Sequence, residues 1–284
     1  MGEEGRAYPL LSLAYLSGHM LSPPDAVVTA AELGYDAVGL RALPAAAGGT
    51  FSPLIQDRAL LAETVRRIRE TGIPVFDVEI VRLAPDFSPK AVEPFLDICG
   101  ELGARAVLVA GDDPDEERLT ASFARFCEAA APYGLTGNLE FMPWTKVPDV
   151  KTALRIVERA GHANGCVLVD ALHVARSATT LADLASIPAG RQTYAQICDA
   201  PAEIPDNDEG LIFTARCERL LPGEGGIDLV SMFSALPADL PVSVEIPNDA
   251  RMPVLGPREW ARQALDATKA VLKRRASSPS SPQG

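Results

Sequence analysis

The chain has 284 residues and a formal net charge of −12, from 26 basic and 38 acidic residues. This acidic balance argues against a nucleic-acid partner or an anionic membrane surface, because both require a basic patch. With 47% hydrophobic residues, the chain can bury a large core, and its length suits one domain. No stretch approaches the roughly 20 apolar residues that a membrane span needs.

The cysteines indicate a reducing compartment. There are five of them, an odd number, and no two have CxxC spacing. We expect reduced and mostly buried thiols in a cytoplasmic protein. The segment from Met1 to Arg6 is not followed by a long apolar run, so we expect no signal sequence.

Short apolar runs alternate with longer amphipathic segments along the chain. The strands are predicted at Leu10–Tyr15, Asp36–Arg41, Ile73–Ile80, Ala104–Ala110, Leu135–Phe141, Val167–Ala171, Tyr194–Cys198 and Val242–Ile246. The helices are predicted at Ser22–Leu33, Leu54–Thr71, Ser88–Leu102, Asp115–Ala131, Pro148–Ala160, Thr180–Ala185, Ile227–Ala235 and Arg258–Arg275. A long polar loop is predicted over Asp199–Gly226.

Eight strand–helix units in regular alternation imply parallel strands with helical crossovers. Such a chain closes best into a single α/β domain, a (β/α)₈ TIM barrel, which we expect over residues 7–275. The Ser/Pro-rich residues 276–284 are predicted to form a disordered tail. The alternative is an open doubly wound sheet, but Ser17-Gly18-His19 lacks the glycine-rich turn typical of that fold.

Four oxygen-bearing side chains stand where consecutive strands end: Glu140, Asp170, Gln196 and Glu245. The carboxyl ends of the strands meet on one face of a barrel, so these side chains should converge there. Three carboxylates this close would repel one another unless a cation lay between them. Their oxygens predict a divalent metal site, best suited to Mg²⁺ or Mn²⁺, with Co²⁺ or Zn²⁺ as alternatives.

Each of these four residues also has a structural interpretation. The glutamate of the fifth strand could be a solvated rim residue, and Gln196 a satisfied polar residue of the barrel. Asp170 could be the N-cap of the following segment. Glu245 could form an ion pair with Arg41 or Arg216. The shared position at strand ends favours the metal site over all four alternatives together.

Further candidates follow the strand ends. His173 stands three residues after Asp170 and could bind a substrate hydroxyl or act as a general acid, or it could cap the next helix. Arg216, Glu79 and Asp199 are candidate substrate-binding residues, because their positions suit an anionic or polyhydroxylated ligand. For Arg219, a solvated loop position is an equal alternative.

The chain resembles the xylose isomerase-like TIM-barrel superfamily, the sugar phosphate isomerase/epimerase group, from about Leu10 to Leu272. The resemblance rests on Asn138-Leu139-Glu140, Asp170-Ala171-Leu172-His173, Gln196-Ile197-Cys198-Asp199-Ala200, Leu221-Pro222-Gly223-Glu224-Gly225 and Ser243-Val244-Glu245.

The resemblance implies that Glu140, Asp170 and Glu245 bind a divalent metal. Many members have histidine as the strand-seven ligand, whereas this chain has Gln196. That difference resembles the bacterial 3-dehydroshikimate dehydratases. The endonuclease IV branch uses a histidine-rich zinc cluster, which three histidines and a charge of −12 make a poor match.

These residues predict an enzyme that abstracts a proton next to a carbonyl, with Glu140 and Glu245 as the catalytic pair. The expected reaction is isomerisation or epimerisation of a sugar, sugar phosphate or polyhydroxylated keto compound. One alternative is a dehydratase with His173 as the acid. Another is a non-catalytic barrel that binds a small polyol. We expect a small sugar-like or keto-polyol partner, and the chain could form homo-oligomers.

Overall fold

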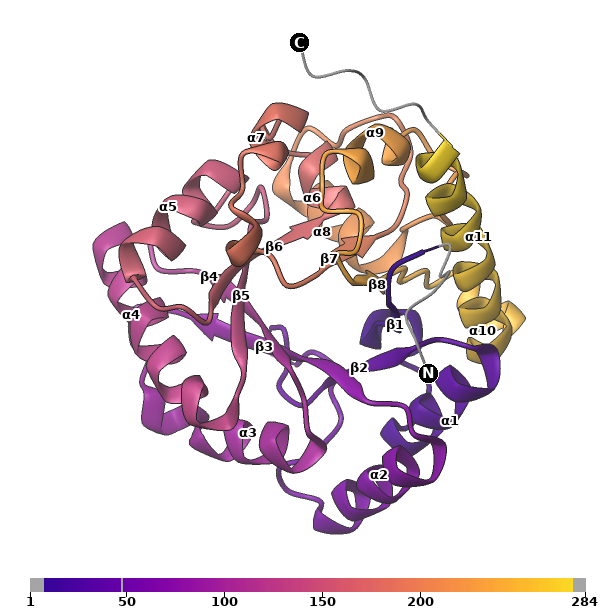
Figure 1. Ribbon diagram of the computed structural model, residues 1–284, viewed down its shortest axis with the longest axis horizontal. Coiled ribbons are helices and arrows are strands. Elements are labelled where there is room, and N and C mark those ends of the chain that lie inside the picture. The colour runs from indigo at the N-terminus through magenta and orange to yellow at the C-terminus, as the bar shows by residue number, and fades with distance from the viewer. Residues whose placement is uncertain (1–7, 47, 278–284) are drawn as a thin grey trace.

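A computed structural model describes residues 8–46 and 48–277. Eight parallel strands form a closed barrel in chain order (Figure 1). The strands are β1 Leu11–Leu13, β2 Ala37–Arg41, β3 Val75–Leu83, β4 Ala106–Gly111, β5 Thr136–Glu140, β6 Gly165–Asp170, β7 Ala195–Ile197 and β8 Val242–Val244. The predicted TIM barrel is confirmed, because β1 pairs with both β2 and β8.

Helices surround the barrel in Figure 1. They are α1 Pro23–Leu33, α2 Arg58–Thr71, α3 Pro89–Leu102, α4 Glu116–Ala130, α5 Val150–Ala160, α6 Ala171–Ala175, α7 Leu181–Ala185, α8 Asp208–Cys217, α9 Leu229–Ser234, α10 Met252–Leu255 and α11 Pro257–Ser277. Three 3-10 turns lie at Tyr15–Ser17, Ala131–Tyr133 and Ala189–Arg191. The expected end signals act as predicted: Ser22 caps α1, and Gly34 ends it with a φ of 82°.

Three parts of the element prediction were wrong. The segment predicted as one loop, Asp199–Gly226, contains α8, and α6 and α10 were not predicted. Of the residues in α8, only Thr214 and Ala215 are buried, so the helix lacks the apolar stripe that reveals helices in a sequence. Ala276 and Ser277 belong to α11 rather than to a tail. Residues 278–284, and residue 7 of the predicted domain, lie outside the described residues.

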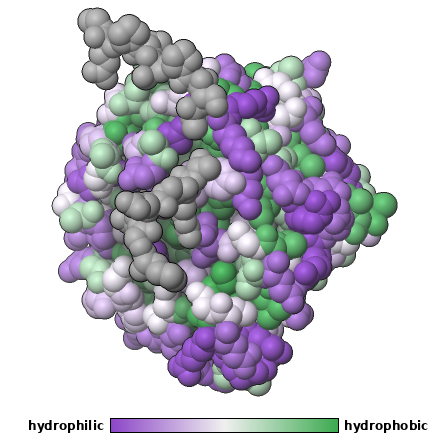
Figure 2. All heavy atoms as spheres, turned by 45° about the vertical axis from the view of Figure 1, so that its right-hand side comes forward, coloured by the Kyte–Doolittle hydropathy of each residue, from purple (hydrophilic) through white to green (hydrophobic). Residues whose placement is uncertain are grey.

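The core has two parts. The larger one fills the space between the outer side of the barrel and the helices, where residues such as Phe123, Phe126 and Trp260 are completely buried. The smaller one lies inside the barrel and includes Phe76 and Tyr194, whose rings meet edge to face. On the outer faces of the helices, charged residues give a largely hydrophilic surface with small apolar areas (Figure 2).

Among the described helices, none has the length and apolar composition to cross a membrane. All five cysteines are free, and four of them are buried, as the sequence predicted.

Polar side chains also occupy the barrel interior. Asp77 is completely buried, and neither of its carboxyl oxygens has a hydrogen-bond partner among the described residues. Gly39 makes room for it on the neighbouring strand, since a Cβ at Gly39 would lie 2.8 Å from an Asp77 oxygen. Burial, followed by the charge of Glu79, raises the pKa of Asp77 well above its usual value. Its surroundings inside the barrel therefore favour the protonated form over the carboxylate.

Candidate active site

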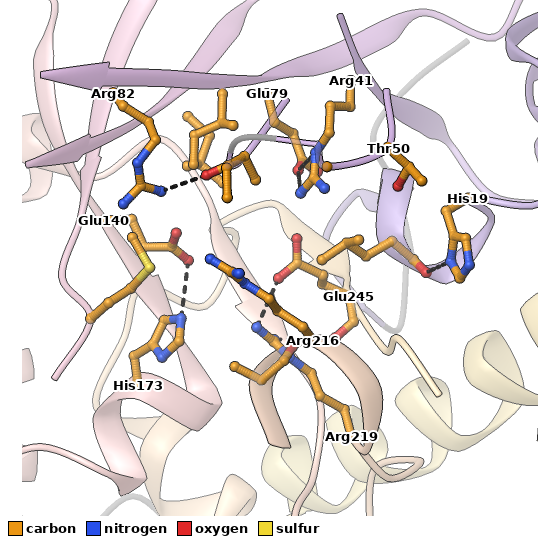
Figure 3. A pocket seen from close by; sticks show the side chains of 18 of the residues that line it. His19, Arg41, Thr50, Glu79, Arg82, Glu140, His173, Arg216, Arg219 and Glu245 are labelled. Carbon is orange, nitrogen blue, oxygen red and sulfur yellow. Dashed lines mark hydrogen bonds and ion pairs between the residues drawn. The ribbon is translucent and has the colours of Figure 1, made fainter. Parts of the chain in front are cut away.

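A cavity of about 300 Å³ opens at the carboxyl ends of the strands. Four of the residues that line it, Glu140, His173, Arg219 and Glu245, come from β5, α6, the segment after α8 and the end of β8. Figure 3 shows Glu140 and Glu245 reaching into it from opposite sides. Of the four side chains that the sequence placed together, Glu140 and Glu245 line the cavity, whereas Asp170 and Gln196 are buried and do not line it.

Asp170 fills two roles at once. Its Oδ1 accepts hydrogen bonds from the backbone amides of Leu172, at 2.8 Å, and His173, at 3.1 Å, so it is the N-cap of α6. Its Oδ2 accepts a hydrogen bond from Nη1 of Arg219 at 2.6 Å. Burial pushes the pKa of Asp170 upward, but the attraction of Arg219 outweighs it and holds that pKa below the usual value. Asp170 is therefore a carboxylate.

Arg219 is the buried cation of the site. Besides Asp170, its guanidinium contacts Glu245, with Nη2 3.1 Å from Oε2. The ion pair considered for Glu245, with Arg41 or Arg216, was therefore assigned to the wrong arginine. The interpretation of Arg219 as a solvated loop residue was wrong too, because only 2% of it is exposed.

Gln196 lies beside Glu245. Its Nε2 donates a hydrogen bond to Oε1 of Glu245 at 3.0 Å, while its own Oε1 is buried without a partner among the described residues. Both oxygens of Glu245 are thus engaged, one by Gln196 and one by Arg219.

His173 is buried at the wall of the cavity. Its Nε2 lies 3.6 Å from Oε1 of Glu140, and its ring stands edge to face against Trp144 at 5.1 Å. Burial lowers the pKa of His173 to about 4. The imidazole is therefore neutral near pH 7, and His173 does not cap a helix, because Asp170 already caps α6.

The two glutamates hold protons unusually well. Burial, then the negative charges of Glu245 and Asp170, raises the pKa of Glu140 well above its usual value. Burial, with further repulsion from Glu79 and Asp170 that Arg219 only partly offsets, raises the pKa of Glu245 to about 8. A raised pKa lets a carboxyl group hold a proton that it can then donate, as a general acid must.

Glu79 lines the other side of the cavity and forms a buried ion pair with Arg41. The guanidinium of Arg41 lies 4.7 Å from the centre of the Tyr15 ring. Burial alone would lower the pKa of Arg41, but the charge of Glu79 outweighs it and raises that pKa. Arg41 engages Oε2 of Glu79, so only Oε1, which has no partner among the described residues, is available to a ligand.

Asp199 does not line the cavity. Its carboxylate accepts hydrogen bonds from the backbone amides of Gly223, Gly225 and Ile227 at 2.8, 3.0 and 3.1 Å. It holds the Pro-Gly-Glu-Gly turn in place. The sequence interpretation of Asp199 as a substrate ligand is therefore not supported by its position.

Part of the predicted ligand set fits a divalent cation, while Arg219 already engages Asp170 and Glu245. Ligand atoms of Glu140, Asp170 and His173 all lie within 4.8 Å of one another. Oε1 of Gln196 is a further buried oxygen that lacks a partner among the described residues, as an unfilled ligand would. The sequence did not place His173 in this group, because a spacing of three after Asp170 suits a helix cap as well as a ligand.

A curated relative matches about half of the chain. Over 162 residues the chain is 31% identical to a 3-dehydroshikimate dehydratase of Pseudomonas aeruginosa. That match takes in 54% of the chain but spans only 25% of the relative.

Solved structures resemble the whole chain at low sequence identity. The IolI protein, solved with a bound zinc atom, has a TM-score of 0.76 at 19% identity and covers 93% of this chain and 98% of its own. A D-allulose 3-epimerase from Methylomonas sp., solved with D-allulose, has a TM-score of 0.67 at 16% identity, covering 93% and 97%. These similarities show the fold alone.

A family model that covers most of the chain identifies its family. The model described as xylose isomerase-like TIM barrel matches residues 27–271, which include every strand from β2 to β8 as well as Glu140, His173, Arg219 and Glu245. Together with the closed barrel, this match means that the chain belongs to the xylose isomerase-like TIM-barrel family.

Proposed function

We propose that the chain is a metal-dependent isomerase or epimerase of a sugar, a sugar phosphate or a keto polyol. The observation that carries the proposal is the pair Glu140 and Glu245, which face each other across the cavity with raised pKa values. Two such groups on opposite sides of a substrate can remove a proton from one face of a carbon and return it to the other.

The chain's own residues would set the direction of proton transfer. Whichever glutamate is ionised acts as the base, and the other, still protonated, acts as the acid. Arg219 keeps Glu245 oriented, while the neutral His173 can donate a hydrogen bond to a substrate hydroxyl. Trp144 fixes the plane of the His173 ring. Arg216 and Glu79 are proposed substrate-binding residues, as both line the cavity.

We propose that Glu140, Asp170, Gln196 and Glu245 hold the ion, with His173 close enough to join them. A divalent cation there would polarise a carbonyl and stabilise an enediolate. Oxygen ligands favour Mg²⁺ or Mn²⁺, and a histidine ligand would add Co²⁺ or Zn²⁺ to the choice.

Deuterium exchange tests this proposal whatever the product is. Protein loaded with Mn²⁺ is incubated in D₂O with D-allulose, D-fructose, L-sorbose and D-fructose 6-phosphate, and each sugar is analysed by mass spectrometry. We expect at least one sugar to gain one deuteron at the carbon next to its carbonyl. The variants Glu140→Gln and Glu245→Gln should lose this exchange by at least about 100-fold, the size of a general acid–base contribution.

A matched control is Glu32→Gln, which removes an exposed glutamate paired with Arg258 on the surface. It should exchange at the wild-type rate. Full exchange in both Glu140→Gln and Glu245→Gln would contradict the proposal.

A second candidate is a dehydratase, which the curated relative favours. Gln196, which is buried among the proposed ligands, also favours a dehydratase, because this residue resembles the bacterial 3-dehydroshikimate dehydratases. In this reaction, abstraction of the proton is followed by departure of a β-hydroxyl. Because His173 is neutral, the proton that leaves with the hydroxyl as water would come from Glu140, whose pKa is raised, and His173 beside it would hold the departing hydroxyl by a hydrogen bond.

Mass spectrometry separates the two candidates. With 3-dehydroshikimate, a dehydratase yields a product lighter by one water molecule, whereas an epimerase yields a product of unchanged mass. The variant His173→Gln should slow loss of water more than it slows deuterium exchange, because only the dehydration needs the departing hydroxyl to be held by His173.

A further inference from the structure

The cavity is lined by four arginines, and three of them are neutralised by carboxylates. The ion pairs are Arg41 with Glu79, Arg82 with Asp112, and Arg219 with Asp170 and Glu245. The fourth is Arg216, which forms no ion pair or side-chain hydrogen bond with any residue that the structure describes.

Arg216 points into the cavity. It belongs to the last turn of α8, and Figure 3 shows its side chain over the cavity that Glu140 and Glu245 also line. A cation in the last turn of a helix is favourable, but that position alone would leave the side chain free to extend into solvent. Asp249 also lines the cavity, yet among the described residues its carboxylate forms no ion pair or hydrogen bond with Arg216.

Arg216 remains exposed at the cavity, and charges of the same sign lie near it. Partial burial of its guanidinium, then repulsion by Arg82 and by Arg41, lowers its pKa. Arg82 reaches the same space while it holds Asp112 and the carbonyl of Ala45. Three guanidinium groups therefore face one region of the cavity, and one of them has no counter-charge among the described residues.

We propose that Arg216, with Arg82 beside it, forms a subsite for an oxyanion carried by the substrate, either a carboxylate or a phosphate. This inference rests on the proposed function, since it assigns a substrate class to the same cavity. The substrate is then an α-hydroxyketone with an anionic group on a carbon away from the reacting one. A planar guanidinium binds carboxylate and phosphate through two parallel hydrogen bonds, which a neutral hydroxyl cannot match.

The arrangement of the cavity agrees with such a substrate. Glu140, His173 and Glu245 gather near the strand ends, whereas Arg216 approaches from α8, outside the barrel strands. A cavity of about 300 Å³ accommodates a compound of six or seven carbons. A substrate that lies between the two groups would place its reacting carbon near the glutamates and its anion near Arg216.

Two matched pairs of compounds test the subsite by calorimetric titration of the full chain. L-Sorbose and 5-keto-D-gluconate differ only in a terminal hydroxymethyl or carboxylate group. D-Fructose and D-fructose 6-phosphate differ only in the phosphate. We expect one anion to bind roughly 10- to 100-fold more tightly than its neutral partner, which is the range for a charge-assisted hydrogen-bond pair. The pair that shows the difference identifies the carboxylate or the phosphate as the group bound.

Variants assign the effect to Arg216. Arg216→Gln should abolish the preference for the anion, and Arg216→Lys should retain part of it, because lysine keeps the charge without the planar fork. Lys90→Gln removes the same charge from an exposed position on α3 and should keep the full preference. The preference should also weaken at high salt.

Three outcomes would overturn the inference: equal binding of anion and neutral partner, an anion preference that survives in Arg216→Gln, or no measurable binding of either anion. The titrations are run on both metal-loaded and chelated protein, because the subsite is made of side chains alone. Anion preference without any deuterium exchange would reject the proposed function and keep the subsite. Deuterium exchange without anion preference would reject the subsite and keep the proposed function.

Discussion

Single side chains in this cavity have charges that differ from those of the same residues in water. Burial and nearby carboxylates raise the pKa values of Glu140 and Glu245, and burial lowers the pKa of His173. Arg219 contacts both Asp170 and Glu245, but only Asp170 also accepts two backbone amide hydrogen bonds, and its pKa is lowered. The charge of each carboxyl group therefore depends on its full set of donors, and the sequence could not tell this.

The pKa of Glu245 predicts how stability changes with pH. Folded Glu245 binds its proton up to about pH 8, whereas an unfolded glutamate releases it near pH 4.3. The folded state thus holds more protons between these values, and its free energy of unfolding falls as the pH rises through that window. In the presence of chelator, Glu245→Gln should gain melting temperature relative to wild type from about pH 5 to about pH 8.

The exposed Glu32 gives the control, since Glu32→Gln should leave the pH profile unchanged. If the melting temperatures of wild type and Glu245→Gln differ by the same amount at every pH in this range, Arg219 keeps Glu245 ionised.

At the level of elements, one residue both begins the short helix α6 and supplies a buried carboxylate to the site. Asp170 ends β6, caps α6 through one oxygen and binds Arg219 through the other. The N-cap interpretation drawn from the sequence is therefore correct. The second oxygen, which the sequence assigned to a metal, binds Arg219, and it has a further lone pair that an ion could use.

Two substitutions separate these roles. Asp170→Asn keeps an oxygen for the cap but removes the charge, whereas Asp170→Ala removes both. In chelator, Asp170→Ala should have a free energy of unfolding about 0.5–2 kcal/mol lower than Asp170→Asn. By elemental analysis, both variants should lose bound Mn²⁺. The same pair of substitutions at Asp149, the N-cap of α5, should show the stability difference with no loss of metal. Retention of Mn²⁺ by Asp170→Asn would exclude the carboxylate as a required ligand.

The limits of prediction also appear at this level. Strands and helices with a clear apolar pattern were placed within a few residues, and Glu140, Gln196 and Glu245 were placed at the site from their position at strand ends. Arg219 was missed because it reaches Asp170, 49 positions away, only after α8 turns the chain back. An aspartate at a strand end can face the cavity or hold a loop, and nothing in the sequence around Asp199 distinguishes the two.

For the whole molecule, a bound metal should contribute to stability. The buried carboxylates of β5, β6 and β8 come together only in the folded barrel, so an ion that binds them favours the folded state. At a Mn²⁺ concentration of about 100 times its Kd, the free energy of unfolding should rise by about 2.7 kcal/mol. Thermal denaturation with and without chelator measures this rise. It should be absent in Glu140→Gln and in the double variant Glu140→Gln/Glu245→Gln. Equal melting temperatures for wild type in both conditions would reject the metal site.

Closure of the barrel has a consequence for how the protein is made. The first strand pairs with the last, and the Ser17 hydroxyl donates a hydrogen bond to the Val244 carbonyl, 227 positions away. Until β8 leaves the ribosome, β1 and β7 are open sheet edges that can pair with other chains. Contacts between such distant residues also form slowly. We therefore expect nascent chains that lack β8 to aggregate or to bind chaperones, and Glu245 to be the last of the site residues to reach its place.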